Sequence, residues 1–165
     1  MTLGVTKVLH VKLPVTDLQH SVTWYGRLMD LALAHEFVEE GELRGAALRS
    51  AEGDFSIALR LRQHCAGSPD LTGHDVAAFH VERREALHDV QRRAADLGAV
   101  HTDVQERGPG QAVVDVTDPD GTVLRFFWVD PAAKPETFIG YVFDGSGPPA
   151  FVTEPRLDAP QVLGR

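Results

Sequence analysis

The sequence predicts an α+β fold made of two tandem βαβββ modules, and three observations predict it. Apolar residues alternate along several short segments, they recur at helical spacing along two longer segments, and the same order of segments occurs twice. With 165 residues and 43% apolar content, the chain is long enough to bury a core. We therefore expect one internally duplicated domain.

The first module begins with an alternating segment, 7–15, which predicts a strand. Thr16 or Asp17 then caps a helix whose apolar face carries Leu18, Val22, Tyr25, Leu28 and Met29. Turn-forming residues separate three further strands, which are expected at 32–38, 43–49 and 54–62.

The second module repeats this order after a loop rich in turn residues. A strand is predicted at 75–81, and a helix follows at 84–97, with Gly98 at the position where a glycine commonly ends a helix. The last three strands are predicted near 99–105, 111–117 and 122–129.

Charge and composition exclude several classes of function. The formal net charge of −8 repels phosphate backbones and anionic lipids, so neither nucleic acid nor a membrane is an expected partner. The only cysteine, Cys65, has no partner for a disulfide, and the N-terminus lacks a signal-peptide pattern, so we expect a cytoplasmic protein. No nucleotide-binding, hydrolase or HExxH motif occurs.

Strand parity predicts which side chains line a pocket. If Val11 and Leu13 contact the helix, then His10 and Lys12 point to the opposite face of their strand. Overlaying SAEGDFSIAL (50–59) on DPDGTVLRFF (118–127) places Ile57 opposite Arg125. The predicted ligand-binding residues are His10, Lys12, Phe55, Ile57, Leu59, Val76, Ala78, His80, Arg125 and Phe127.

Arg125 is the most informative of these residues, because a charged side chain in an apolar strand needs a partner. It can pair with an acidic neighbour in a purely structural ion pair, or it can contact a ligand. Parity favours the ligand contact.

Two motifs, HVKLPVTDLQHSVTWYGRLMDL and DPDGTVLRFF, resemble the vicinal-oxygen-chelate superfamily, which includes glyoxalases, fosfomycin-resistance enzymes, extradiol dioxygenases and bleomycin-resistance proteins. The resemblance implies a cup-shaped, partly closed mixed sheet with the helices outside. It implies a domain at 1–130, with modules at about 5–63 and 74–130, and a homodimer. A proline-rich C-terminal extension, 131–165, remains, and we expect it to dock on the domain or on a partner subunit.

Metalloenzymes of this superfamily hold a divalent ion, and the resemblance assigns the equivalent positions to His10, Val76 and Arg125. Of these, only His10 can ligate a metal, and a guanidinium opposes a cation, so no cofactor is expected. The alternative is a bulge that brings His74 inward; His10 and His74 are then the only candidate ligands for Fe, Mn, Ni or Zn.

Three functions remain open, and the sequence does not decide whether the protein is an enzyme. The first is metal-free binding of a small aromatic or polar metabolite or antibiotic in the cup, where His10, Lys12 and Arg125 favour an anionic or phenolic group. The second is a lyase, isomerase or ring-cleaving dioxygenase that uses a divalent metal, or metal-free proton transfer with His10 as the base. The third is an oligomer whose cups are vestigial.

Overall fold

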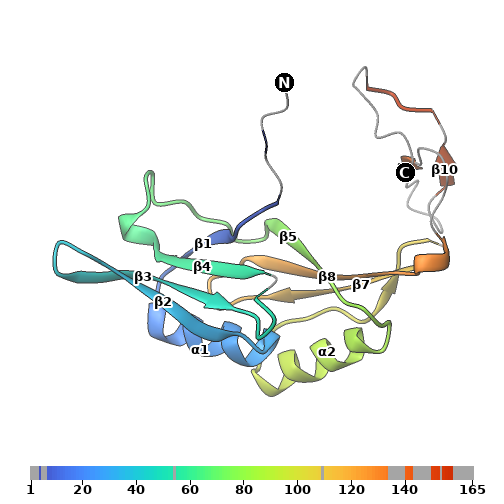
Figure 1. Ribbon diagram of the computed structural model, residues 1–165. Coiled ribbons are helices and arrows are strands. Elements are labelled where there is room, and N and C mark those ends of the chain that lie inside the picture. The colour runs from blue at the N-terminus through green and yellow to red at the C-terminus, as the bar shows by residue number, and fades with distance from the viewer. Residues whose placement is uncertain are drawn as a thin grey trace.

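The computed structural model describes Gly4, 7–53, 55–108, 110–133, 140–142, 150–152 and 154–157. Its element order is the predicted duplication, shown in Figure 1. The first module consists of β1 (Val11–Val15), α1 (Leu18–Met29), β2 (Ala32–Glu39), β3 (Glu42–Arg49) and β4 (Ser56–Leu61). The second consists of β5 (Asp75–His80), α2 (Ala86–Asp96), β6 (Gln105–Glu106), β7 (Gln111–Thr117) and β8 (Val123–Val129).

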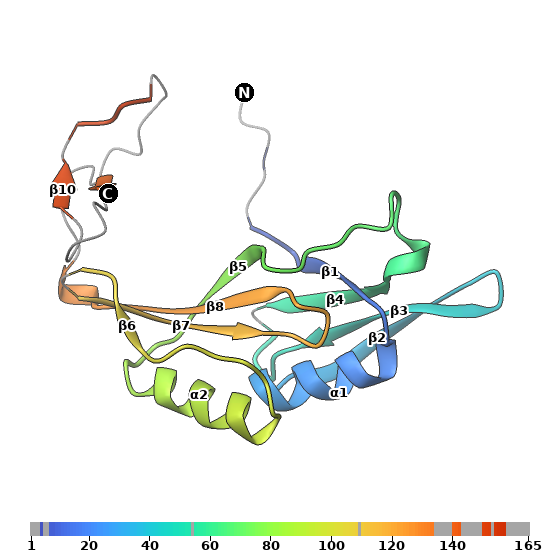
Figure 2. The ribbon, with the colours of Figure 1, turned by 180° about the vertical axis from the view of Figure 1, so that it is seen from behind.

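Each module forms one four-stranded mixed sheet, and the two sheets have the same topology. The strand orders are β1-β4-β3-β2 and β5-β8-β7-β6, with the first pair of each sheet parallel and the others antiparallel. Figures 1 and 2 show α1 and α2 on the same side of the two sheets. We call the face of each sheet opposite the helices the open face. The α+β class and the tandem modules are thus confirmed, and the sheets are not closed into a barrel.

Helix α1 forms where its capping signals and its apolar spacing agree. The Asp17 side chain accepts a hydrogen bond from the backbone N–H of His20 at 2.9 Å, and Asp30 ends the helix in the left-handed conformation at φ 53°. The buried face carries Leu18, Ser21, Trp24, Tyr25 and Leu28. Burial of each large apolar side chain stabilises the fold by roughly 1.5–3 kcal/mol.

Both modules contribute to one continuous core. Leu87, Val90 and Ala94 of α2 belong to the same buried cluster as the apolar face of α1 and the inner faces of both sheets. Arg93 of α2 also reaches α1, because it donates to the Leu28 carbonyl at 3.3 Å and pairs with Asp30 at 2.6 Å. The modules therefore fold as one domain rather than two.

The strand predicted at 99–105 is wrong except at its end. Gln105 and Glu106 pair regularly with β7, while the segment 100–102 contacts β7 through an isolated bridge of His101 to Val116 and two backbone hydrogen bonds. The Thr102 hydroxyl accepts the Asp115 N–H at 3.0 Å, and Val100 is 74% exposed. The Thr102 side chain therefore takes the place of a backbone carbonyl as the acceptor for Asp115, and the regular hydrogen-bond pattern between two strands is lost.

The C-terminal extension forms one further hairpin in its described part. A short turn of 3-10 helix, Pro131–Ala133, precedes β9 (Gly140–Val142) and β10 (Ala150–Val152), which pair antiparallel in a sheet of their own. Part of the apolar segment 138–143 lies outside the described residues, and the docking of the extension stays a prediction. In the described parts of the chain, no helix has the length and apolar character that a membrane span requires.

Candidate functional site

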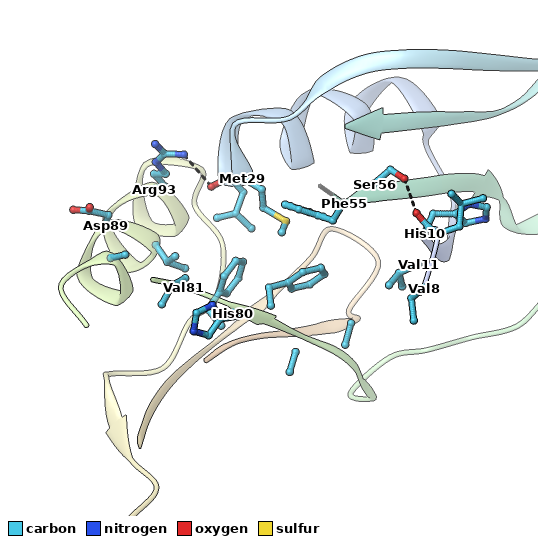
Figure 3. A pocket seen from close by; sticks show the side chains of 18 residues that line it. Val8, His10, Val11, Met29, Phe55, Ser56, His80, Val81, Asp89 and Arg93 are labelled. Atoms are coloured by element: carbon cyan, nitrogen blue, oxygen red, sulfur yellow. Dashed lines mark hydrogen bonds between the residues drawn. The ribbon is translucent and has the colours of Figure 1, made fainter. Parts of the chain in front are cut away.

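A cavity of about 630 Å³, which we call the intermodule cavity, lies where the two modules meet. Figure 3 shows Met29 and Phe55 of the first module pointing into it, with His80 and Val81 of the second module across from them. Its walls come from the segment 8–11, the end of α1, β5 and α2. Most of the lining is apolar, and its polar groups are His10, Ser56, His80, Asp89 and Arg93.

Three aromatic rings connect the modules along this cavity. The rings of Phe55 and Phe79 lie 6.0 Å apart between centroids, and Phe79 lies 5.7 Å from Phe126, both in tilted arrangements. Such ring pairs attract each other beyond the area that they bury. Phe55 is also 37% exposed, so its ring still has a free face that a ligand could cover.

The polar groups at the α2 end of the cavity are already paired. Asp89 accepts a hydrogen bond from Arg92 at 2.7 Å, and Arg93 pairs with Asp30 at 2.6 Å. The Arg92 hydrogen bond holds the pKa of the Asp89 carboxyl below its ordinary value. This end of the cavity is therefore electrically balanced.

A second hollow of about 390 Å³, which we call the basic groove, lies on the open face of the first sheet. Its floor consists of small residues of the two central strands, Gly45, Ala47 and Ala58. Ala58 pairs with Lys12 of β1 and with Ala47, and Ala47 pairs with His35 of β2, so these four side chains share one row across the sheet. Small side chains in the middle and long ones at the sides make the face hollow.

Basic side chains surround this groove. Lys12, Arg49 and Arg60 line it, together with a single acidic residue, Glu39. Arg60 binds Glu39 through two hydrogen bonds of 2.6 and 2.7 Å, which lower the pKa of the Glu39 carboxyl. In the described residues, Lys12 and Arg49 have no ion-pair partner.

Arg125 lies on the open face of the second sheet, as parity predicts, and two carboxylates hold it. Its Nε and Nη2 donate to Asp115 at 2.8 and 2.9 Å, and its Nη1 lies 2.8 Å from Asp75. The Asp115 hydrogen bond raises the pKa of the guanidinium above its ordinary value. Arg125 borders neither the intermodule cavity nor the basic groove. Of the two alternatives for Arg125, a structural ion pair and a ligand contact, this geometry favours the structural ion pair.

The resemblance to metalloenzymes implies a divalent ion, and the residues present do not fit one. Among the described residues, no group of three or more His, Cys, Asp or Glu side chains is placed to hold a metal. Asp75 and Asp115 are the carboxylates nearest the expected position, and the Arg125 guanidinium already neutralises them. A bulge does occur in β5, between Asp75 and Ala77, but His74 stays exposed.

Several of the predicted residues line one of the two hollows. His10, Phe55, Ala78 and His80 line the intermodule cavity together, and Lys12 lines the basic groove with His10. Phe127 pairs with His80 on the open face of the second sheet without lining either hollow.

Three predicted residues point the other way. Ile57 and Leu59 are 0% and 1% exposed and pack in the core against α1. Leu59 also contributes to the lining of the basic groove. Val76 packs against the same core, because the β5 bulge removes it from the row of Ala78 and Arg125. These placements correct the parity of β4 and of the start of β5.

Sequence reasoning missed the residues that come from other elements. Arg49 shares the open face with Ala47, two residues earlier in β3, so parity applied to the segment 43–49 could have found it. Met29 and Arg93 reach the intermodule cavity from two helices, and no local pattern indicates how the modules pack.

Comparisons with known proteins agree with this architecture. The family model of the Glyoxalase/Bleomycin resistance protein/Dioxygenase superfamily matches residues 7–126. A glyoxylase/bleomycin resistance protein/dioxygenase domain from Frankia is 25% identical, with a TM-score of 0.62, and the match covers 77% of this chain and all of that one. No curated protein matches.

Two further solved structures show the same fold at lower identity. A mutant of the fosfomycin resistance protein FosX from Listeria monocytogenes, in complex with Mn(II) and dihydroxypropylphosphonic acid, is 16% identical, with a TM-score of 0.61 and coverage of 80% and 96%. A lactoylglutathione lyase from Agrobacterium tumefaciens is 14% identical, with a TM-score of 0.58 and coverage of 74% and 93%.

Proposed function

We propose that this chain, which belongs to the Glyoxalase/Bleomycin resistance protein/Dioxygenase superfamily, binds a small aromatic metabolite or antibiotic in the intermodule cavity without a metal ion. The cavity itself carries the proposal. Its volume of about 630 Å³ lies in the range of pockets that enclose small organic ligands, and its lining is mostly apolar with a few polar groups.

The aromatic lining supports an aromatic ligand. A ring placed against the exposed face of Phe55 would continue the series that Phe79 and Phe126 begin. His10 and His80 lie on opposite walls and can each donate or accept a hydrogen bond, so they can orient a polar substituent. Apolar burial would supply the affinity, and these groups would supply the orientation.

The ion pair of Arg125 supports metal-free binding. The resemblance assigns to Arg125 the position at which related metalloenzymes have a carboxylate, and the guanidinium already pairs with the two carboxylates beside it. A divalent ion placed here would have to displace Arg125 and would meet its charge. The solved FosX structure contains Mn(II), so metal-free binding would distinguish this chain from FosX.

A fluorescent apolar probe, phenylnaphthylamine, tests the cavity. Ala78 lines it with an exposed methyl group, so Ala78→Trp should narrow it and weaken binding by about tenfold or more. Val100→Trp adds the same ring at an exposed site outside the cavity lining and should leave the affinity unchanged. Equal affinities in the two variants, or no saturable binding in the wild type, would overturn the proposal.

Metal analysis tests the second half of the proposal. Protein purified without chelators should contain no stoichiometric Fe, Mn, Ni or Zn, and EDTA should leave probe binding unchanged. The variant Arg125→Glu would put a third carboxylate beside Asp75 and Asp115, so Mn(II) should raise its melting temperature and not that of the wild type. A stoichiometric ion in the wild type would contradict metal-free binding.

A further inference from the structure

The intermodule cavity and the basic groove adjoin each other. Leu9, His10 and Ser56 line both hollows. The Ser56 hydroxyl donates to the Leu9 carbonyl at 3.0 Å, which fixes the segment that separates them. Figure 3 shows this hydrogen bond beside His10, at the edge of the intermodule cavity. A molecule that fills the cavity can therefore extend past His10 onto the first sheet.

The two hollows differ in charge. In the intermodule cavity, Asp89 and Arg93 each have a partner, and the remaining lining is largely apolar. In the basic groove, the bond of Arg60 to Glu39 leaves Lys12 and Arg49 as two positive charges with no partner in the described residues. This local excess is positive in a chain whose net charge is −8.

The sheet geometry lets these two cations meet one ligand group. Lys12 lies on β1 and Arg49 on β3, with β4 between them, and Arg49 pairs with Ser56, one row from the pair of Lys12 and Ala58. Two strand spacings and one row separate their Cα atoms by about 12 Å. Side chains as long as Lys and Arg can converge over that distance above a floor of methyl groups.

We propose that the natural ligand is an amphipathic organic anion, with its aromatic body in the intermodule cavity and its carboxylate, sulfonate or phosphate group in the basic groove against Lys12 and Arg49. This inference rests on the proposed function and adds the chemical class of the ligand. It also replaces Arg125 by Arg49 as the cation that meets the ligand, because Asp75 and Asp115 neutralise Arg125.

Two probes that differ by one acidic group test the inference. Anilinonaphthalene sulfonate and phenylnaphthylamine share an aromatic skeleton, and only the first is an anion. We expect the sulfonate to bind about tenfold more tightly, since hydrogen bonds to charged groups contribute more than neutral ones. The advantage should shrink as sodium chloride is added, because the two cations are exposed.

Charge-removing variants locate the effect. Lys12→Gln and Arg49→Gln should each reduce the affinity for the sulfonate severalfold, the double variant should abolish its advantage, and phenylnaphthylamine should bind all of them equally. Arg27→Gln removes the same charge from the exposed side of α1 and should change neither affinity. All of these are exposed positions, so folding should be retained.

The outcomes separate this inference from the proposed function. If phenylnaphthylamine binds in the cavity and the sulfonate has no advantage, or keeps it in the double variant, the anion site is wrong while the cavity stands. If neither probe responds to Ala78→Trp, the proposed function fails first. If Arg27→Gln reduces sulfonate binding as much as Arg49→Gln, the effect is one of net charge, and the groove is not the site.

Discussion

At the scale of single residues, Tyr25 and Asp118 connect the two modules through a buried hydrogen bond. The Tyr25 hydroxyl donates to Asp118 at 2.7 Å, and the two residues are 0% and 5% exposed. Asp118 also accepts the backbone N–H groups of Asp120 and Thr122, at 2.9 and 2.8 Å. The carboxylate thus fastens its own turn in the second module to helix α1 of the first.

Tyr25→Phe should lower the free energy of unfolding by about 1–3 kcal/mol at neutral pH, because it leaves a buried carboxylate oxygen without its partner. Urea denaturation measures the change. A double-mutant cycle with Asp118→Asn separates the hydrogen bond from lost packing, and additive effects of the two changes would contradict the bond.

The pH dependence of this pair has a definite sign. Burial raises the pKa of the Asp118 carboxyl above its ordinary value, so its ionisation costs stability as pH rises through the interval between the unfolded and folded pKa values. The hydrogen bond from Tyr25 lowers that pKa and offsets part of the cost, but only when Asp118 is ionised. The stability difference between wild type and Tyr25→Phe should therefore be largest at neutral pH and fall in acid.

At the scale of elements, the β3–β4 turn is one residue longer than the β7–β8 turn, and this difference explains why Ile57 was assigned to the wrong face of β4. Arg49 pairs with Ser56 across the β3–β4 turn, whereas Thr117 pairs with Val123 across the β7–β8 turn, so the first connection is one residue longer. Alignment of the two turns by their glycines places Ile57 on the face of Arg125, and a slip of one residue reverses every side chain of a strand. Alternation within β1 and β8 needs no such alignment and was predicted correctly.

The candidate site was predictable to the extent that it lies on single strands. His10, Lys12, Ala78 and His80 were predicted from single alternating segments, and each of them lines one of the two hollows. The bulge that turns Val76 into the core leaves no local signal in the sequence, and Met29 enters the cavity only through the packing of two helices. Sequence periodicity predicts which face of a helix or strand is buried, but it does not predict how the two modules contact each other.

Gly45 forms part of the floor of the basic groove, at a point where neighbouring groups approach its backbone closely. A Cβ at this position would lie 2.8 Å from the Leu59 carbonyl oxygen and 3.3 Å from the Phe37 ring. Gly45→Ala should therefore destabilise the protein by about 1–3 kcal/mol, although alanine normally stabilises a strand relative to glycine. Urea denaturation measures it, and Phe37→Leu in the same background separates ring crowding from backbone crowding. Unchanged or increased stability would contradict the close approach.

At the scale of the whole molecule, we expect the two sheets and two helices to form a unit that is stable without the extension. The family match ends at residue 126, and 77% of this chain covers all of the Frankia domain. Of the described strands, β9 and β10 hydrogen-bond only to each other. Among the residues that the structure describes, the core cluster contains only residues of the two modules.

Removal of residues 134–165 should therefore leave the melting temperature within about 2 °C of the wild type, since the cooperative core stays intact. Phenylnaphthylamine affinity should also be unchanged, because the described residues that line the intermodule cavity end at Phe126. Calorimetry and probe titration of the truncated and full chains measure both, and sedimentation at equal concentrations compares their oligomeric states. A lower melting temperature with an unchanged state would mean that the extension docks on its own domain, whereas loss of a dimer would mean that it docks on a partner subunit.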